Sequence, residues 1–202
     1  MNMKKCLQAF SLGLVFIVFC GFAYPLLTLA IGQIAFPWQA NGSMIKVGGK
    51  VVGSELIGQN FTDKRFFHGR VSSINYSTFP AGTKTEDIVP GSGSANYSVS
   101  NPDLTKRVKT DVAAFLKANP GLTEKELPAD LFTSSFSGLD PDITPADAQI
   151  QVNGIVKATG LSKAQIQKII SDNTVGRDIG IFGETRVNVL KANLDIYKLL
   201  KK

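Results

Sequence analysis

Charged residues are missing from a long stretch near the N-terminus of this 202-residue chain. No Asp, Glu, Lys or Arg stands between Lys5 and Lys46, and residues 7–36 are mostly Leu, Ile, Val, Phe, Ala and Gly. About 20 apolar residues are enough for a helix to cross the hydrocarbon core of a bilayer. The lack of charge therefore predicts a transmembrane anchor over residues 1–36, with a short cytoplasmic N-terminus, and Pro25 predicts a kink within it.

A cleaved signal peptide is the alternative interpretation, because Lys4 and Lys5 precede the apolar run and Gly21-Phe22-Ala23 is an acceptable cleavage site. Signal peptides have about 7 to 15 apolar residues, whereas this run continues well beyond Ala23, which favours a retained anchor. The positive-inside rule then predicts a cytoplasmic N-terminus. We expect a single-pass protein of the cell (inner) membrane whose main domain lies outside.

Cysteine and histidine are almost absent. The only cysteines, Cys6 and Cys20, lie in the apolar run, 14 positions apart on one helix, which is too far for a disulfide. The rest of the chain therefore has neither disulfides nor thiol chemistry. His68 is the only histidine and belongs to no HxxE or HxxxH pair, so the sequence contains no pattern typical of a zinc site.

The common nucleotide motifs are also missing. The chain has no GxxxxGK[ST] phosphate loop, no GxGxxG between a strand and a helix, and no DKTGT phosphorylation motif. Beyond Lys5 there are 20 basic and 16 acidic residues, and no run of Lys and Arg is longer than two. Since nucleic-acid binding normally requires a clustered basic face, we expect no nucleic-acid partner.

The remaining sequence predicts a linker over residues 37–49 and a single mixed α/β domain over residues 50–202. Short strands are expected at Val51–Val52 and Leu56–Ile57, and another at Leu131–Phe132, while residues 77–101 read as a loop. Apolar residues at helical spacing predict four helices. Their stripes are Leu104, Val108, Val112 and Phe115; Ala148, Val152, Ile155 and Val156; Ile166, Ile169 and Ile170; and Leu190, Leu194 and Tyr197.

Three of these helices have recognisable ends. Asn101, Thr144 and Ser162 are suited to cap the N-termini of the first three, because their side chains can accept a hydrogen bond from a free backbone N–H. Gly160 is suited to end the second helix in the left-handed conformation. Asp147 lies in the first turn of that helix, where the helix dipole favours a carboxylate.

The segment TSSFSGLDPDITPADAQIQVN, residues 133–153, is rich in hydroxyl groups, aspartates and prolines. Ser137, His68 and Asp140 together offer the residue types of a hydrolytic triad, although no GxSxG motif supports it. Asp140 and Asp142 are possible calcium ligands, but the EF-hand pattern is incomplete. Turn formation and helix capping are the more common roles of such aspartates. Asp140 has no cation next to it in the sequence, so its carboxylate either accepts from nearby backbone N–H groups or meets another subunit.

Several stretches, taken in order, resemble the KdpC family, the C subunit of the Kdp high-affinity potassium-transporting ATPase. The resemblance covers nearly the whole chain, and the order and spacing of the stretches are more specific than any one of them. They are GSELIGQNF (53–61), FFHGRVSS (66–73), NPDL (101–104), SGLDPDITPADAQIQV (137–152) and GETRVNVLKANLD (183–195).

This resemblance implies a non-catalytic accessory subunit that stabilises a potassium pump and covers the outer mouth of its ion path. Its partners would be a channel-like potassium-translocating subunit and a P-type ATPase subunit, which uses the ATP, so no cofactor is expected here. The loop that contains residues 137–141 would be a family signature with a structural role or a role at a subunit contact. The candidate contact residues are Ser137, Gly138, Leu139, Asp140 and Pro141.

Two alternatives stay open. Gln151 occupies the position of a family glutamine that is linked to a nucleotide-chaperone role, which would aid ATP binding by the ATPase subunit, but the expected outside location weighs against it. A membrane-anchored hydrolase using Ser137 and His68 is the competing class. The chain departs from the family pattern at Asp142, Gly154 and Val71, so roles specific to those positions are not carried over.

Overall fold

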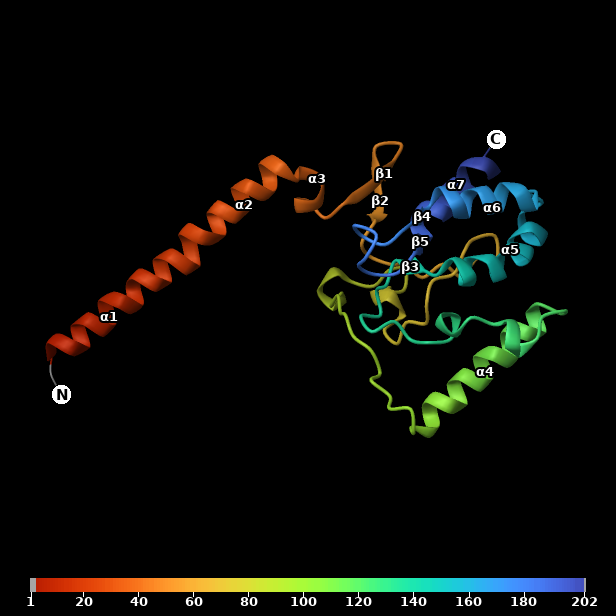
Figure 1. The fold of residues 1–202 in the computed structure, drawn as a ribbon, viewed down its shortest axis with the longest axis horizontal. Coiled ribbons are helices and arrows are strands. Elements are labelled where there is room, and N and C mark those ends of the chain that lie inside the picture. Colours follow the sequence, from red (N-terminus) through yellow and green to blue (C-terminus); the bar gives the residue numbers. More distant parts are fainter. Residues whose placement is uncertain (1–2, 202) are drawn as a thin grey trace. The chain divides into compact units, whose positions relative to one another are not determined.

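A computed structural model of the chain describes residues 3–201, drawn in Figure 1. The chain divides into two compact units, the first ending at Ser54 and the second beginning at Glu55. The first unit is mainly one long apolar helix, and the second is a mixed α/β domain. The N-terminal helix and the mixed α/β class agree with the sequence prediction, while placement outside the membrane stays a prediction.

The first unit begins with a helix long and apolar enough to cross a membrane, and it is the one such helix in the part of the chain that the structure describes. It consists of α1 (Met3–Val18), a π-helical turn η1 (Phe19–Ala23) and α2 (Tyr24–Ala35). The π-helical turn ends two residues before Pro25, whose missing N–H interrupts the regular hydrogen-bond ladder of the helix. Such turns are found where this ladder is interrupted. No residue of the helix is buried.

A short helix and a hairpin complete the first unit. Helix α3 (Pro37–Ala40) is followed by β1 (Met44–Val47) and β2 (Lys50–Ser54), which pair antiparallel with a bulge between Ile45 and Lys46. The predicted strand at Val51–Val52 lies within β2, whereas Leu56 and Ile57 lie outside any strand. The predicted linker thus contains a helical turn and a strand.

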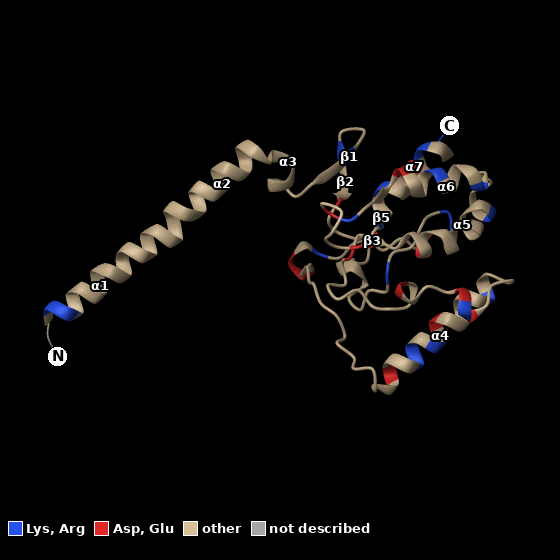
Figure 2. Cartoon of the chain, in the orientation of Figure 1, with Lys and Arg blue, Asp and Glu red and all other residues tan. Residues whose placement is uncertain are grey.

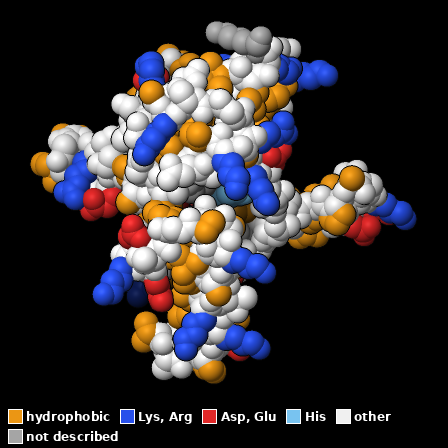
Figure 3. All heavy atoms as spheres, turned by 90° about the vertical axis from the view of Figure 1, so that its right-hand side faces the viewer, with side chains coloured by type: hydrophobic (Ala, Val, Ile, Leu, Met, Phe, Trp, Pro, Cys, Tyr) orange, Lys and Arg blue, Asp and Glu red, His pale blue; other side chains and the backbone are white. Residues whose placement is uncertain are grey.

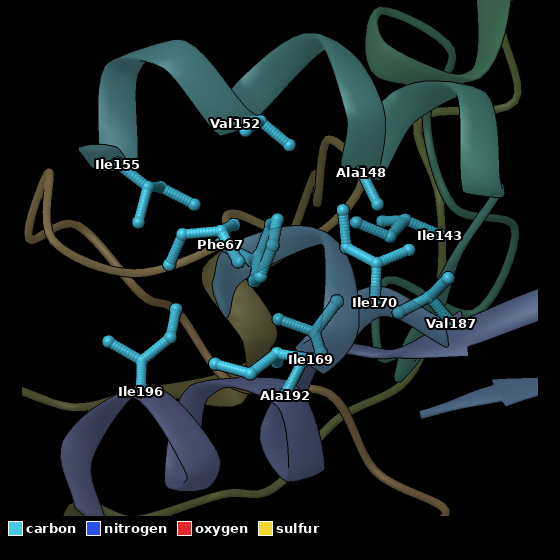
Figure 4. Close-up of a cluster of buried hydrophobic side chains, with 12 residues drawn as sticks. Phe67, Ile143, Ala148, Val152, Ile155, Ile169, Ile170, Val187, Ala192 and Ile196 are labelled. Carbon is cyan, nitrogen blue, oxygen red and sulfur yellow. The ribbon is translucent and has the colours of Figure 1, made fainter. Parts of the chain in front are cut away.

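Three helices and a small sheet form the core of the second unit. The strands β3 (Asp142–Ile143), β4 (Thr174–Val175) and β5 (Arg186–Asn188) are antiparallel in the order β3-β5-β4. Helix α6 (Lys163–Asp172) packs against both α5 (Pro145–Thr159) and α7 (Val189–Leu200). Figure 4 shows the buried cluster between these helices and the sheet, with Phe67 among the isoleucines.

The predicted helix ends are confirmed. The Asn101, Thr144 and Ser162 side chains accept from the backbone N–H groups of Asp103, Asp147 and Gln165, and Gly160 adopts the left-handed conformation after α5. In α7 the buried face differs from the predicted stripe. Leu190 is buried as predicted, together with Ala192 and Ile196, whereas Leu194 is half-buried and Tyr197 is 38% exposed.

Helix α4 (Pro102–Ala118) lies apart from this core and carries charges of both signs along its length (Figure 2). The apolar stripe predicted for this helix does not become part of the buried core, because none of the residues of α4 is buried. Its apolar face is half-buried, and the Phe115 ring meets Phe132 edge-on at 5.8 Å between centroids. The buried core cluster contains no residue of α4. Full burial of the apolar stripe of α4 would require another element to pack against it.

The expected strand at Leu131–Phe132 is also wrong. A 3-10 helix, η5 (Ala129–Leu131), occupies this position, and the only pairing nearby is an isolated bridge between Val71 and Ser134. The other 3-10 helices of the described chain are η2 (Asn75–Ser77), η3 (Thr85–Asp87) and η4 (Glu124–Glu126). Residues 77–101 otherwise form the loop that the sequence predicts.

Candidate functional site

The candidate site centres on the loop at residues 133–142, which we call the signature loop. Arg70 joins its two ends. One guanidinium nitrogen, Nη1, lies 3.0 Å from Asp140 Oδ2, and Nη2 donates to Thr133 Oγ1 at 3.2 Å and to the Ser134 carbonyl at 3.4 Å. The Asp140 carboxylate also accepts from the Asp142 N–H at 3.1 Å. Asp140 is therefore bonded inside the domain, to a cation 70 residues away as well as to a neighbouring backbone N–H.

Serine side chains hold the middle of the signature loop. Ser135 is buried, and its Oγ accepts from the N–H groups of Gly138 (3.0 Å) and Asp140 (3.3 Å). Ser137 Oγ accepts from the Leu139 N–H at 3.0 Å, while the Ser137 carbonyl accepts from Gly93 at 2.7 Å. The loop is thus fixed by its own hydroxyls and by the segment around Gly93.

Two glycines allow neighbouring segments to approach the loop closely. Gly138 is buried at a φ of +68°, and a Cβ there would lie 2.5 Å from Ile74 and 2.7 Å from the Gly93 carbonyl oxygen. Gly58 donates to the Leu139 carbonyl at 2.8 Å, and its Cβ would lie 2.3 Å from the Asp140 carbonyl oxygen. Both positions exclude any side chain because rigid backbone stands in the way.

Tyr76 supports the loop from a strained turn. Asn75, Tyr76 and Ser77 all have φ near +53°, a left-handed conformation that is uncommon for residues with a Cβ. Ser72 Oγ accepts from the Tyr76 N–H at 2.8 Å and donates to the Gly138 carbonyl at 2.8 Å, while the Tyr76 hydroxyl donates to the Arg70 carbonyl at 2.5 Å. Burial, with Asp140 close by, raises the pKa of Tyr76 to about 12, so its hydroxyl keeps the proton that it donates.

A pocket of about 400 Å³ opens beside this turn. Its walls combine amide, hydroxyl, imidazole and apolar groups from residues 60–76, including Asn60, Phe61, His68, Ser72 and Asn75. Asn60 Nδ2 donates to Asn75 Oδ1, and His68 Nδ1 contacts the Phe61 carbonyl oxygen. Several of the polar groups that line the pocket are therefore hydrogen-bonded to one another.

Two buried side-chain amides clamp the segment at residues 67–68 onto the helices. Gln151 Oε1 accepts from the His68 N–H at 2.8 Å, and its Nε2 donates to the His68 carbonyl (3.2 Å) and to Asp147 Oδ1 (2.9 Å). Asn193 makes the same paired contact with the Phe67 backbone, at 2.7 and 2.9 Å. Both donors of the Gln151 amide are therefore occupied within the domain, and contact with nucleotide stays a prediction.

Asp147 is fully buried beside this clamp. One carboxylate oxygen accepts from Gln151, while the other, Oδ2, has no hydrogen-bond partner within the described residues. Burial raises the pKa of Asp147 to about 7, and the Gln151 hydrogen bond opposes the shift only in part. The sequence predicts only a carboxylate favoured by the helix dipole at this position, and no pattern in it indicates that Asp147 is buried.

The Asp140 and Asp142 carboxylates pair with different arginine side chains. Asp142 lies 3.3 Å from Arg186 Nε and accepts from Asn188 Nδ2 at 3.1 Å, whereas Asp140 pairs with Arg70. Burial raises the pKa of Asp142, against the opposing effect of the Asn188 hydrogen bond. Within residues 3–201, no group of three or more His, Cys, Asp or Glu side chains is placed to hold a metal ion.

The possible hydrolytic triad of Ser137, His68 and Asp140 is not assembled either. Ser137 Oγ contacts Ser135 Oγ and the Leu139 N–H, His68 contacts Phe61, and Asp140 pairs with Arg70. Across the described chain no hydrogen bond joins any two of Ser137, His68 and Asp140. The hydrolase alternative therefore has no nucleophile–base pair in this arrangement.

The predicted contact residues differ in what they offer to a partner. Ser137 is exposed and Gly138 is buried, while Leu139, Asp140 and Pro141 are half-buried. The most exposed large apolar side chain of the loop is Phe136, at 85%, and it is not among the predicted contact residues. In the sequence, this exposed side chain is indicated by a single aromatic residue inside a polar stretch. On the face drawn in Figure 3, basic side chains are separated by acidic, hydrophobic and neutral ones.

Comparison with known proteins gives a consistent result. A profile of the family described as "K+-transporting ATPase, c chain" matches residues 6–198. The potassium-transporting ATPase KdpC subunit of Clostridium kluyveri is 51% identical over 199 residues, covering 98% of this chain and 95% of that protein. The KdpC subunit of Clostridioides difficile is 50% identical over 209 residues, with 98% and 99% coverage. That of Caldanaerobacter subterraneus is 46% identical over 189 residues, with 94% and 92% coverage.

Proposed function

This chain belongs to the KdpC family of potassium-transporting ATPase subunits, and we propose that it is a non-catalytic accessory subunit that stabilises the pump. In this proposal its apolar helix crosses the cell membrane, and its second unit lies outside and covers the outer mouth of the ion path. The neighbouring chains are a channel-like potassium-translocating subunit and a P-type ATPase subunit that hydrolyses ATP.

One observation carries the proposal: a 33-residue apolar helix, Met3–Ala35, has no buried residue in its most apolar window. Its full apolar surface is unfavourable in water, so it requires lipid or the helices of partner subunits. Lys4 and Lys5 at its start support a cytoplasmic N-terminus. The second unit would then lie outside, away from cytoplasmic ATP.

The bonding of Gln151 supports the accessory role over the nucleotide-chaperone role. Its amide is 7% exposed and makes three hydrogen bonds that hold Asp147 and the His68 backbone. Binding a nucleotide through Gln151 would require breaking these bonds, and it is costly to leave the half-buried His68 backbone and the buried Asp147 carboxylate with fewer partners. In this proposal ATP is bound and hydrolysed by the P-type ATPase subunit and not by this chain.

Copurification tests the role, and thiol labelling tests the orientation. The full chain should copurify in mild detergent with both partner subunits, while residues 40–202 alone should be folded and show no ATP hydrolysis. A cysteine at the exposed position Ser100, with Cys6 and Cys20 replaced, should react with a membrane-impermeant thiol reagent once the outer barrier is opened.

Two results would contradict the proposal. Labelling that appears only after the inner membrane is broken would place the second unit inside and would favour the nucleotide role of Gln151. Turnover by purified residues 40–202 that is lost in Ser137→Ala or His68→Ala would favour the hydrolase.

A further inference from the structure

The connection between β4 and β5 presents an unusual group of exposed apolar side chains. We call residues 177–184 the apolar turn. Ile179, Ile181 and Phe182 are 88%, 69% and 65% exposed. Single exposed apolar residues are ordinary, but an adjacent group on one short turn commonly marks an interaction site. No other part of the described domain buries these three side chains, so the fold itself gains little from them.

The apolar turn is ordered by its own hydrogen bonds. The Asp178 N–H donates to the Phe182 carbonyl at 2.8 Å, and the Phe182 N–H donates back to the Asp178 carbonyl at 3.0 Å. An ion pair of 2.8 Å between Arg177 and Glu184 closes its base. The three apolar side chains are therefore presented on a preformed backbone, which lowers the entropy lost when they bind a partner.

Ile179 adds an independent observation, because its φ is +56°. A β-branched residue in the left-handed region is a genuine outlier, whereas Gly or Asn adopts this conformation readily. Ile179 is thus unfavourable on two counts, since its backbone is strained and its side chain is almost fully exposed. Backbone strain of this kind is concentrated at functional sites, and the exposed Ile179 side chain contributes little to the packing of the domain.

The charges around the apolar turn favour a protein partner over a lipid surface. Arg177 pairs with Glu184, and Arg186 lies 3.8 Å from Asp178, so two positive and two negative charges balance. Segments that insert into membranes usually add basic residues that attract anionic headgroups. A rigid, locally neutral turn with a bulky apolar tip instead resembles the anchor that fills a pocket in a protein interface.

We propose that Ile179, Ile181 and Phe182 insert into an apolar pocket on the channel-like potassium-translocating subunit, whose outer mouth the second unit covers in the proposed function. This inference rests on the proposed function, because it requires the subunit to be assembled with its partners. It is distinct from the predicted contact at residues 137–141. The apolar turn would be an anchoring contact in its own right.

The test compares Ile179→Asn with the matched control Val99→Asn in the full-length chain. Asn tolerates the left-handed backbone, so Ile179→Asn should leave thermal unfolding of the detergent-solubilised chain unchanged or slightly raised. Recovery with tagged partner subunits should fall about tenfold. Val99 is 94% exposed but lies outside the apolar turn, so Val99→Asn should assemble like the wild type.

Photo-crosslinking from position 181 separates the possible occupants. With Cys6 and Cys20 replaced, Ile181→Cys carrying a photoreactive group should crosslink to the channel-like subunit in the assembled complex. Crosslinking only to lipid, to the ATPase subunit or to a second copy of this chain, or full assembly of Ile179→Asn, would overturn this inference while leaving the proposed function intact. Failure of the wild-type chain itself to copurify would overturn both.

Discussion

The signature loop and the apolar turn use their side chains in opposite ways. In the signature loop, Arg70, Ser72 and Gly93 reach in from distant parts of the sequence and bond Asp140 and the carbonyls of Gly138 and Ser137. The apolar turn bonds mainly within itself and exposes its large apolar side chains. The difference indicates that substitutions in the first should change stability, and those in the second should change assembly.

The largest expected effect contrasts one glycine from each loop. Gly138→Ala should lower the free energy of unfolding of residues 40–202 by about 2–4 kcal/mol, because its φ is positive and its Cβ would meet Ile74 and the Gly93 carbonyl. Gly180→Ala, at φ +75° with nothing within 4 Å, should cost only about 1 kcal/mol of backbone strain. Equal losses in urea unfolding would contradict the close packing of the signature loop.

The second prediction concerns the buried carboxylate that follows the signature loop. The pKa of Asp147 rises from an ordinary 3.8 to about 7 on folding, so the unfolded chain loses its proton first and stability falls as the pH rises from about 4 to about 7. Asp147→Asn should therefore raise the free energy of unfolding by about 2–4 kcal/mol at pH 8. At pH 4 the gain should disappear. Unfolding curves at both pH values test this, and a gain that is the same at both would exclude titration of Asp147 as the cause.

The third prediction concerns the helix cap that follows the signature loop. The Thr144 hydroxyl accepts from the Asp147 N–H at 3.1 Å at the start of α5. Thr144→Ala should lower the free energy of unfolding by about 1 kcal/mol, whereas Thr144→Ser should keep most of the stability. Thermal melting of residues 40–202 measures both changes. An equal loss in the two variants would assign the effect to the methyl group of Thr144 and not to the cap.

The smallest effect compares the ion pairs of the two loops by double-mutant cycles. The side chains of Arg70 and Asp140 are 27% and 28% exposed, whereas those of Arg177 and Glu184 are 48% and 78% exposed. We expect a coupling energy of about 1 kcal/mol for the first pair and about 0–0.5 kcal/mol for the second. If Asp140 also contacts a partner, Asp140→Ala should reduce copurification more than Arg70→Ala at matched stability. An equal reduction would make Asp140 purely structural.

The predictions from sequence were most successful where a few neighbouring residues decide the structure. Asn101, Thr144, Ser162 and Gly160 mark the helix ends, because capping bonds join residues two to four positions apart. The strands were harder to predict. With only two or three residues each, β3, β4 and β5 are too short for an alternating pattern to show, and Leu131 and Phe132 suggested a strand where a 3-10 helix forms.

By itself, the sequence determined the apolar helix, the family and three of the helices with their caps, because hydropathy and capping act along the chain. Only the tertiary structure decided that Arg70 pairs with Asp140, that Gln151 and Asn193 clamp residues 67–68, and that Asp147 is buried. These contacts join groups up to 126 positions apart. Their energies depend on burial and on partner geometry, which arise only when distant segments pack together.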